Sequence, residues 1–381
     1  MITRLKSNRI ILKDGITDGY VYYDENGIIS VTCEEKEYEK EIDCGDMYVS
    51  PGFIDIHVHG ALDEDFCEAD PDGIVNACNF HLRHGTTTIL PTVTSVTFPL
   101  IDKSLCNLKS AVASGKIIPN VAGAHLEGPY FSPKMCGAQN PDNITLPKKT
   151  DYLPLIEKHG DIIKRWSFAP ELSGSVEFSQ ELVQRGIMPS VGHSAAVYSD
   201  VKAVYDKGVR QITHLFCCTS TITKKNAYRS LGVIESAFLL DGITAELIAD
   251  GCHLPPELIN MTLKIMGDGN IVFITDAMQA TGSESKTSSI GGVPCIIEDG
   301  VAKLTDRSSF AGSVATADRL VRVGYKDCKM PIYTAVKFAS YNPARLLGLK
   351  KGSIENGYDA DLLVFDDDIN IKKVIVGGKE V

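Results

Sequence analysis

The sequence predicts an α/β protein with a (β/α)8 barrel over residues 51–349 and a small β domain built from both ends of the chain. Three observations support this prediction: a length of 381 residues, short apolar runs that alternate with longer amphipathic stretches, and His, Asp or Glu where several apolar runs end. At roughly 100 to 200 residues per domain, this length accommodates one large barrel and a smaller companion.

Composition narrows the class of protein. Hydrophobic residues make up 44% of the chain and charged residues 23%, as in ordinary folded proteins. A net charge of −11 without a basic patch argues against a nucleic-acid partner. No apolar run is long enough for a membrane span, and residues 1–14 lack the apolar core of a secretory leader, so we expect a cytoplasmic protein without a membrane partner. The eleven cysteines form no C-x-x-C pair, which favours reduced thiols.

Both ends of the chain have the pattern of β-hairpins. Residues 9–12, 20–23 and 28–31 are short strand-like runs separated by turn signals such as Asn26-Gly27. Residues 360–365 and 373–376 have the same pattern near the other end. Because chain termini often lie close together, we expect residues 1–50 and 350–381 to form one small domain.

The central region alternates between predicted strands and predicted helices. Strands are expected over 86–92, 121–127, 188–193, 211–214, 244–250 and 271–276, and a helix over 73–84. An open, doubly wound sheet is the alternative architecture. The ends of the runs favour a TIM-type barrel, because barrel enzymes collect their chemistry at the C-terminal ends of strands. These strand-end residues are His57, His59, Glu127, His193, His214 and Asp276.

His57 and His59 are two positions apart, so on a strand both side chains point to one face. An H-x-H pair alone is equally compatible with two ordinary polar histidines. Glu127, His193 and His214 at other strand ends change this interpretation. Imidazole and carboxylate groups together are the ligands expected for zinc or iron with room for water.

The ordered motifs resemble the amidohydrolase superfamily and, within it, the family of N-acetylglucosamine-6-phosphate deacetylases. The resemblance covers nearly the whole chain. It rests on Pro51-Gly52-Phe53-Ile54-Asp55-Ile56-His57-Val58-His59-Gly60, His84-Gly85-Thr86-Thr87, His125-Leu126-Glu127-Gly128-Pro129-Tyr130, Ala169-Pro170-Glu171, Gly192-His193-Ser194, Thr213-His214-Leu215-Phe216, Ile248-Ala249-Asp250-Gly251-Cys252-His253, Thr275-Asp276-Ala277-Met278 and Ala311-Gly312-Ser313.

The resemblance implies a barrel flanked by a small β-sandwich formed by both termini. It also implies one or two divalent ions, zinc or iron, with Glu127, His193 and His214 as ligands of the first and His57 and His59 available for a second. Asp276 would be the catalytic carboxylate. The cation would lower the pKa of water towards about 7 and polarise the acyl carbonyl, while Asp276 would move a proton from that water to the leaving amine.

The sequence departs from the family pattern around the expected substrate. Gln139 stands where the family usually has His, and Cys217-Cys218-Thr219 stands where it usually has Asn-Ala-Met. We expect Gln139, Cys217 and Cys218 to line the substrate pocket. The leading substrate is N-acetylglucosamine 6-phosphate, and the alternatives are its galactosamine epimer or another N-acyl compound. A binding protein without turnover is a third interpretation, which the presence of Asp276 disfavours.

A substrate phosphate carries about −1.5 to −2 charges near neutral pH, so a chain of net charge −11 must meet it with local cations and backbone donors. The expected contacts are His253 and the basic segment that contains Lys224, Lys225 and Arg229. The family resemblance places that segment at a homodimer interface, where one subunit completes the site of the other.

Overall fold

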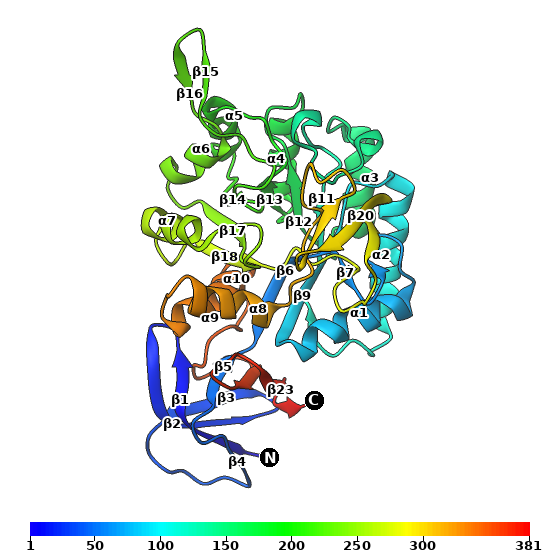
Figure 1. Ribbon diagram of the computed structural model, residues 1–381. Helices are drawn as coiled ribbons and strands as arrows, with labels where there is room; N and C mark the ends of the chain where they lie inside the picture. Colours follow the sequence, from blue (N-terminus) through cyan, green and yellow to red (C-terminus); the bar gives the residue numbers. More distant parts are fainter.

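The computed structural model describes residues 1–381 and contains a nearly closed parallel barrel (Figure 1). The barrel order is β6-β9-β11-β12-β13-β14-β17-β18. A parallel bridge between Val58 and Ala277 joins the two ends of this order, so the first and last strands meet. The barrel prediction is confirmed, and the open-sheet alternative is wrong. The strands are β6 (Phe53–Val58), β9 (Thr86–Val93), β11 (Ala124–Glu127), β12 (Ile163–Phe168), β13 (Met188–Val191), β14 (Gln211–Ile212), β17 (Thr244–Ile248) and β18 (Ile271–Ile274), with the short β10 (Asn120–Val121) beside β9.

Helices follow the strands and surround the barrel (Figure 1). The first begins where the side chain of Asp70 accepts the N–H of Gly73, and Pro71 occupies its first turn, where a missing N–H costs nothing. Trp166 of β12 packs against Phe178 of α4 and Tyr130, all buried in the main apolar core. The helices are α1 (Pro71–Arg83), α2 (Phe98–Ala113), α3 (Lys149–His159), α4 (Ser175–Gln184), α5 (Tyr198–Tyr205), α6 (Val233–Leu239), α7 (Pro256–Met266), α8 (Ala317–Arg322), α9 (Ile332–Ala339) and α10 (Tyr341–Leu347), with short 3₁₀ helices at Pro133–Met135 and Pro141–Asn143 and a short π-helix at Val323–Asp327.

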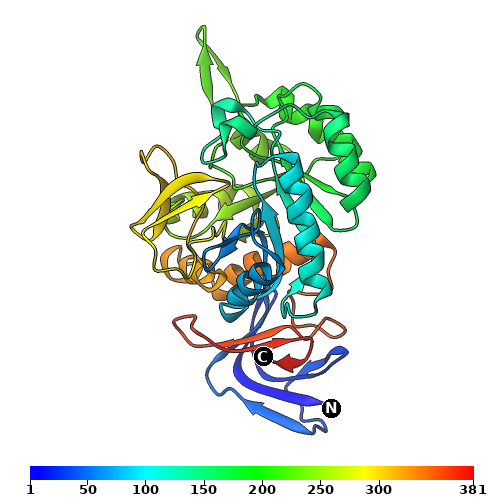
Figure 2. The same ribbon diagram turned by 90° about the vertical axis from the view of Figure 1, so that its right-hand side faces the viewer.

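Strands from both termini form one further sheet below the barrel, as Figure 2 shows. Its order is β24-β23-β22-β5-β1-β2-β3, with β4 paired to β1. β5 and β22, more than 300 residues apart, pair antiparallel with Tyr48 opposite Phe365. A separate apolar core that includes Leu5, Val21 and Leu362 stabilises this sheet. The strands are β1 (Thr3–Leu12), β2 (Gly15–Asp24), β3 (Gly27–Thr32), β4 (Lys40–Asp43), β5 (Tyr48–Pro51), β22 (Leu362–Phe365), β23 (Ile371–Val376) and β24 (Lys379–Glu380).

Three inserted β segments follow barrel strands, two as hairpins and one as a small sheet. β7 (Gly60–Ala61) and β8 (Glu64–Asp65) form a small hairpin directly after β6. β15 (Thr223–Lys225) and β16 (Tyr228–Ser230) form an exposed hairpin that projects from the body of the molecule, at the top of Figure 1. β19 (Thr287–Ile290), β20 (Val293–Glu298) and β21 (Val301–Leu304) form a three-stranded antiparallel sheet after β18.

No helix combines the length and apolarity that crossing a membrane requires. All eleven cysteines are free thiols.

Candidate active site

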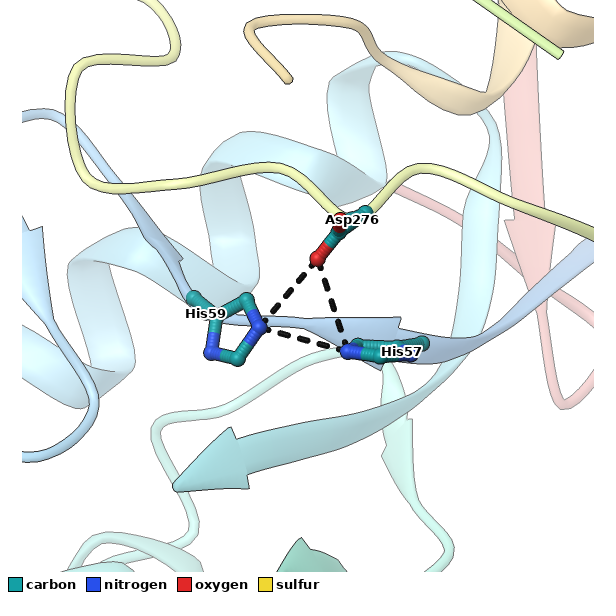
Figure 3. Close-up of side chains that lie close together, drawn as sticks. All are labelled: His57, His59 and Asp276. Carbon is teal, nitrogen blue, oxygen red and sulfur yellow. Dashed lines mark hydrogen bonds and ion pairs between the residues drawn. The ribbon is translucent and has the colours of Figure 1, made fainter. Parts of the chain in front are cut away.

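The barrel brings the six strand-end residues together in two adjoining clusters. In the first, the His57 cluster, His57 lies in β6, His59 directly follows that strand, and Asp276 follows β18, the neighbouring strand across the barrel closure (Figure 3). The two Nε2 atoms lie 3.2 Å apart, and Asp276 Oδ1 lies 3.4 Å from His57 Nε2 and 3.2 Å from His59 Nε2. The i, i+2 spacing therefore does place both imidazoles on one face, as the sequence predicts.

Glu127, His193 and His214 form the second cluster, the Glu127 cluster, at the ends of β11, β13 and β14. Glu127 Oε1 lies 3.2 Å from His193 Nε2 and 2.9 Å from His214 Nε2, and the two Nε2 atoms are 3.1 Å apart. Glu127 also reaches the first cluster, because its two oxygens lie 3.4 Å from the Nε2 atoms of His57 and His59. One carboxylate thus joins both clusters into one centre.

Three of these residues have left-handed backbone conformations. The φ angles are +44° at His193, +29° at His214 and +49° at Asp276. Such angles are uncommon outside glycine and concentrate at functional sites, where surrounding structure holds them. All three lie just after a barrel strand, and their side chains reach the two clusters.

Hydrogen bonds fix the orientation of three imidazoles. Nδ1 of His193 lies 3.0 Å from the Met135 carbonyl oxygen, and Nδ1 of His214 lies 3.1 Å from that of Cys217. Because a carbonyl oxygen only accepts, Nδ1 carries a proton in both rings, and in the neutral ring that binds a metal Nε2 then presents a lone pair. His57 Nδ1 lies 3.3 Å from Glu246 Oε2, which fixes the same tautomer.

The electrostatics of the centre favour a positive charge. Burial alone would lower the pKa of His57, but the charges of Glu127 and Asp276 outweigh it and raise that pKa to about 10. Burial would raise the pKa of Glu127, yet the positive charge at His57 and hydrogen bonds from the other imidazoles hold it well below its usual range. A buried centre of this kind stabilises either bound protons or a bound metal cation.

The donor set fits a divalent cation. Two imidazole lone pairs 3.1 Å apart repel unless a cation lies between them. Nitrogen ligands at the usual 2.0 to 2.1 Å from a tetrahedral zinc ion are about 3.3 Å from each other, close to this spacing. Glu127, His193 and His214 could therefore hold one ion, and His57, His59 and Asp276 could face a second.

A cavity of about 500 Å³ opens directly above this centre. His59, Glu127, His193, His214 and Asp276 line its floor. Four sequence-predicted substrate residues also line it, namely Gln139, Cys217, Cys218 and His253. Lys225 and Arg229 do not, because they lie on the exposed β15–β16 hairpin outside the cavity.

Gln139 and His253 are held in place by specific contacts. Gln139 Nε2 donates to Glu127 Oε2 at 2.6 Å, while its Oε1 accepts from Thr94 Oγ1 and the Ser95 N–H. It thus supports the Glu127 carboxylate besides lining the cavity. His253 Nδ1 donates to Asp250 Oδ2 at 2.9 Å, and this hydrogen bond keeps the pKa of the buried Asp250 below its usual range against the effect of burial.

Sequence reasoning missed four charged residues near the centre. Lys303 and Arg307, from the three-stranded insertion and its following turn, line the cavity. Arg165 and Glu246 form a buried ion pair beneath it. Arg165 and Glu246 could have been found from the sequence. A charged residue inside an apolar strand is seldom buried without a partner.

The family model of the amidohydrolase family matches residues 48–381. The N-acetylglucosamine-6-phosphate deacetylase of Lysinibacillus sphaericus is 31% identical over 333 residues, which cover 87% of this chain and 85% of that protein. The Danio rerio enzyme of the same name is 30% identical over 370 residues, covering 95% and 89%.

Solved structures of N-acetylglucosamine-6-phosphate deacetylases have the same fold as this chain. The Mycobacterium smegmatis enzyme superposes with a TM-score of 0.93 at 28% identity, covering 100% of both chains. The Thermotoga maritima enzyme gives 0.87 at 29% identity, covering 100% of this chain and 99% of that one. Matched by a family model over most of its length and by relatives about 30% identical, the chain belongs to the amidohydrolase family.

Proposed function

We propose that this protein is a metal-dependent hydrolase that removes acetate from N-acetylglucosamine 6-phosphate to give glucosamine 6-phosphate. The observation that carries the proposal is the buried centre of imidazoles and carboxylates on the floor of the cavity. Its relatives are deacetylases of this substrate by name, which supports the same reaction.

Glu127, His193 and His214 would hold the first divalent cation, zinc or iron. His57 and His59, beside Glu127, would hold a second when both positions fill. A bound divalent cation at such a centre acidifies water and polarises an acyl carbonyl.

Asp276 would move the proton during hydrolysis. Burial tends to raise the pKa of Asp276, but interactions with the neighbouring imidazoles of His57 and His59 keep it below its usual range, so the carboxylate is ionised at neutral pH. An ionised carboxylate that lines the cavity can remove a proton from the attacking water and then deliver it to the leaving amine. The sharp turn at Asp276 points the carboxylate towards both histidines of the first cluster.

The phosphate would bind at the open side of the cavity. His253 contributes from within the chain, since Asp250 holds its ring through Nδ1 and leaves Nε2 available. We propose that Lys225 and Arg229 act across a homodimer, because they do not line their own cavity and the hairpin that bears them projects from the body of the molecule. Each charge-assisted contact to phosphate contributes roughly 1.5 to 3 kcal/mol.

Light scattering measures whether the protein is a dimer in solution. Steady-state kinetics of the variants test the phosphate contacts. We expect Lys225→Ala and Arg229→Ala to lower kcat/KM for the phosphorylated sugar by about one to two orders of magnitude. The unphosphorylated sugar should be unaffected. Equal losses for both sugars, or no loss, would show that these residues do not bind the phosphate.

The second candidate keeps the chemistry and changes the substrate to N-acetylgalactosamine 6-phosphate or another N-acyl compound. Gln139, Cys217 and Cys218 line the cavity with chemistry that differs from the family pattern, which is why this candidate stays open. Comparing kcat/KM across a panel tests it. A tenfold preference for the glucosamine substrate, about 1.4 kcal/mol in the transition state, would argue against this alternative.

Release of acetate from N-acetylglucosamine 6-phosphate by the metal-loaded protein tests the proposal itself. Release no greater than that of a chelator-treated control would contradict it. We further propose that residues 51–349 carry this chemistry, that residues 1–50 and 350–381 support it as a separate domain, and that the enzyme works in the cytoplasm, where its free thiols stay reduced.

A further inference from the structure

A buried ion pair crosses the interior of the barrel beneath the two clusters. Arg165 comes from β12 and Glu246 from β17, and β13 and β14 separate these strands in the sheet. Their side chains nevertheless form an ion pair, each about 1% exposed, so they meet across the barrel lumen and not along its wall. Arg165 also donates to Ser190 Oγ at 2.9 Å and Thr213 Oγ1 at 3.0 Å.

Glu246 contacts both clusters from below. Its Oε2 accepts from His57 Nδ1 at 3.3 Å and from the main-chain N–H of His214 at 3.2 Å. Its Oε1 accepts from Arg165. A single carboxylate therefore holds the ring of one cluster and the backbone of the other, while the arginine fixes the carboxylate itself.

We propose that Glu246, anchored by Arg165, is a positioning residue that keeps the His57 lone pair directed at the cation centre. Partners of this kind set the tautomer of a ligand histidine and raise its basicity. The inference rests on the proposed function only in that a cation is bound at the centre.

The chemistry of the three donors explains why a carboxylate is needed. His57 Nδ1, the His214 N–H and Arg165 all donate to Glu246, and an ionised carboxylate only accepts. A glutamine there has one accepting oxygen and one donating NH₂. If its oxygen stays with Arg165, its NH₂ faces His57 Nδ1. That ring must then carry its proton on Nε2, the atom that faces His59, Glu127 and Asp276.

Titration of the full-length protein with Co²⁺, after removal of bound metal, tests the proposal. We expect Glu246→Gln to lower the affinity for the ion next to His57 by about 10- to 100-fold. Glu246→Asp, which keeps the charge, should lose less. Asp361→Asn is the matched control, because Asp361 is also buried, pairs with Lys351 at 2.7 Å and accepts the Gly377 N–H, but lies outside the barrel, directly before β22 of the terminal sheet. Equal affinity in wild type and Glu246→Gln, an equal loss in the control, or no binding of an ion beside His57 in the wild type would overturn the proposal.

Nitrogen-15 NMR of the wild-type histidines, with Zn²⁺ bound, gives a readout that does not depend on any variant folding. We expect the His57 ring to be protonated at Nδ1 and not at Nε2, and the opposite tautomer would overturn the proposal. Acetate release is measured in parallel. A wild type that binds cations without releasing acetate would contradict the proposed function alone, whereas unchanged cation affinity in Glu246→Gln would contradict this inference alone.

Discussion

The two clusters at the barrel mouth differ in what holds their imidazoles. His193 and His214 both donate Nδ1–H to main-chain carbonyl oxygens, which neither titrate nor rotate independently. In the other cluster, His57 relies on the side chain of Glu246, and the buried Nδ1 of His59 has no hydrogen-bond partner. The Glu127 cluster is therefore the more rigidly organised of the two, and we expect it to bind the tighter cation.

Loss of Glu127 should have the largest effect, because this carboxylate touches all four histidines of the centre. We expect Glu127→Ala to lose most of its bound metal and roughly 10⁴-fold or more in kcat/KM, since cation stabilisation of the transition state is several kcal/mol. Elemental analysis of protein purified without chelator measures the first effect. Full metal occupancy in the variant would mean that the ligands are assigned wrongly.

Asp276→Asn should separate chemistry from cation binding. We expect kcat to fall by about 10²- to 10⁴-fold, because the amide cannot move the proton. Metal at the Glu127 cluster should remain, since none of its three ligands depends on Asp276. Unchanged turnover in this variant would rule out the proton-transfer role, while a large loss would rule out a protein that only binds sugar phosphate.

A matched pair of substitutions measures the difference between the clusters directly. His193→Asn removes an imidazole whose Nδ1–H is bound by a main-chain carbonyl oxygen. His59→Asn removes an imidazole whose Nδ1 has no hydrogen-bond partner. We expect the His193 variant to lose about tenfold more affinity for its ion than the His59 variant loses for the second ion. Calorimetric titration with Zn²⁺ gives both values. Equal losses would remove the distinction between a tight and a weak site.

Acid should weaken the fold near the His57 cluster. His81 donates Nε2–H to the Gly60 carbonyl oxygen at 3.0 Å, directly after His59, and burial lowers its pKa to about 4. A histidine whose folded pKa lies below the unfolded value of about 6.5 keeps its full contribution above pH 6.5 and loses it as pH falls towards 4.

Between pH 7 and pH 5 this group alone should lower the free energy of unfolding by roughly 2 kcal/mol. His81→Gln, which retains an N–H donor but does not titrate, should show a correspondingly flatter pH dependence. Urea denaturation of both proteins at the two pH values measures it. Parallel pH dependences would show that His81 already protonates freely in the folded state.

The sequence was enough to predict the barrel and the residues at its mouth, because parallel strands that close into a barrel must end around one opening. His57, Glu127 and Asp276 are far apart in the chain, yet their positions at strand ends determine that they meet.

Contacts across the barrel interior were not predictable in the same way. Arg165 and Glu246 meet because strand tilt and stagger align β12 with β17. Local hydrophobic periodicity in the sequence determines neither the tilt nor the stagger. The contact of Gln139 with Glu127 likewise depends on the path of the loop after β11. The resemblance to a family placed Lys225 near a phosphate, whereas a single chain leaves it on an exposed hairpin, and only an assembled dimer tests that placement.

Cation-dependent deacetylation is tested most directly by adding Zn²⁺ or Fe²⁺ back to chelator-stripped protein while acetate release from N-acetylglucosamine 6-phosphate is followed. We predict that release is negligible without metal, rises as the first equivalent fills the Glu127 cluster, and stays absent in Glu127→Ala at every metal concentration. Release by the stripped protein, or none at saturating metal in the wild type, would contradict the assignment of this centre as the catalytic site.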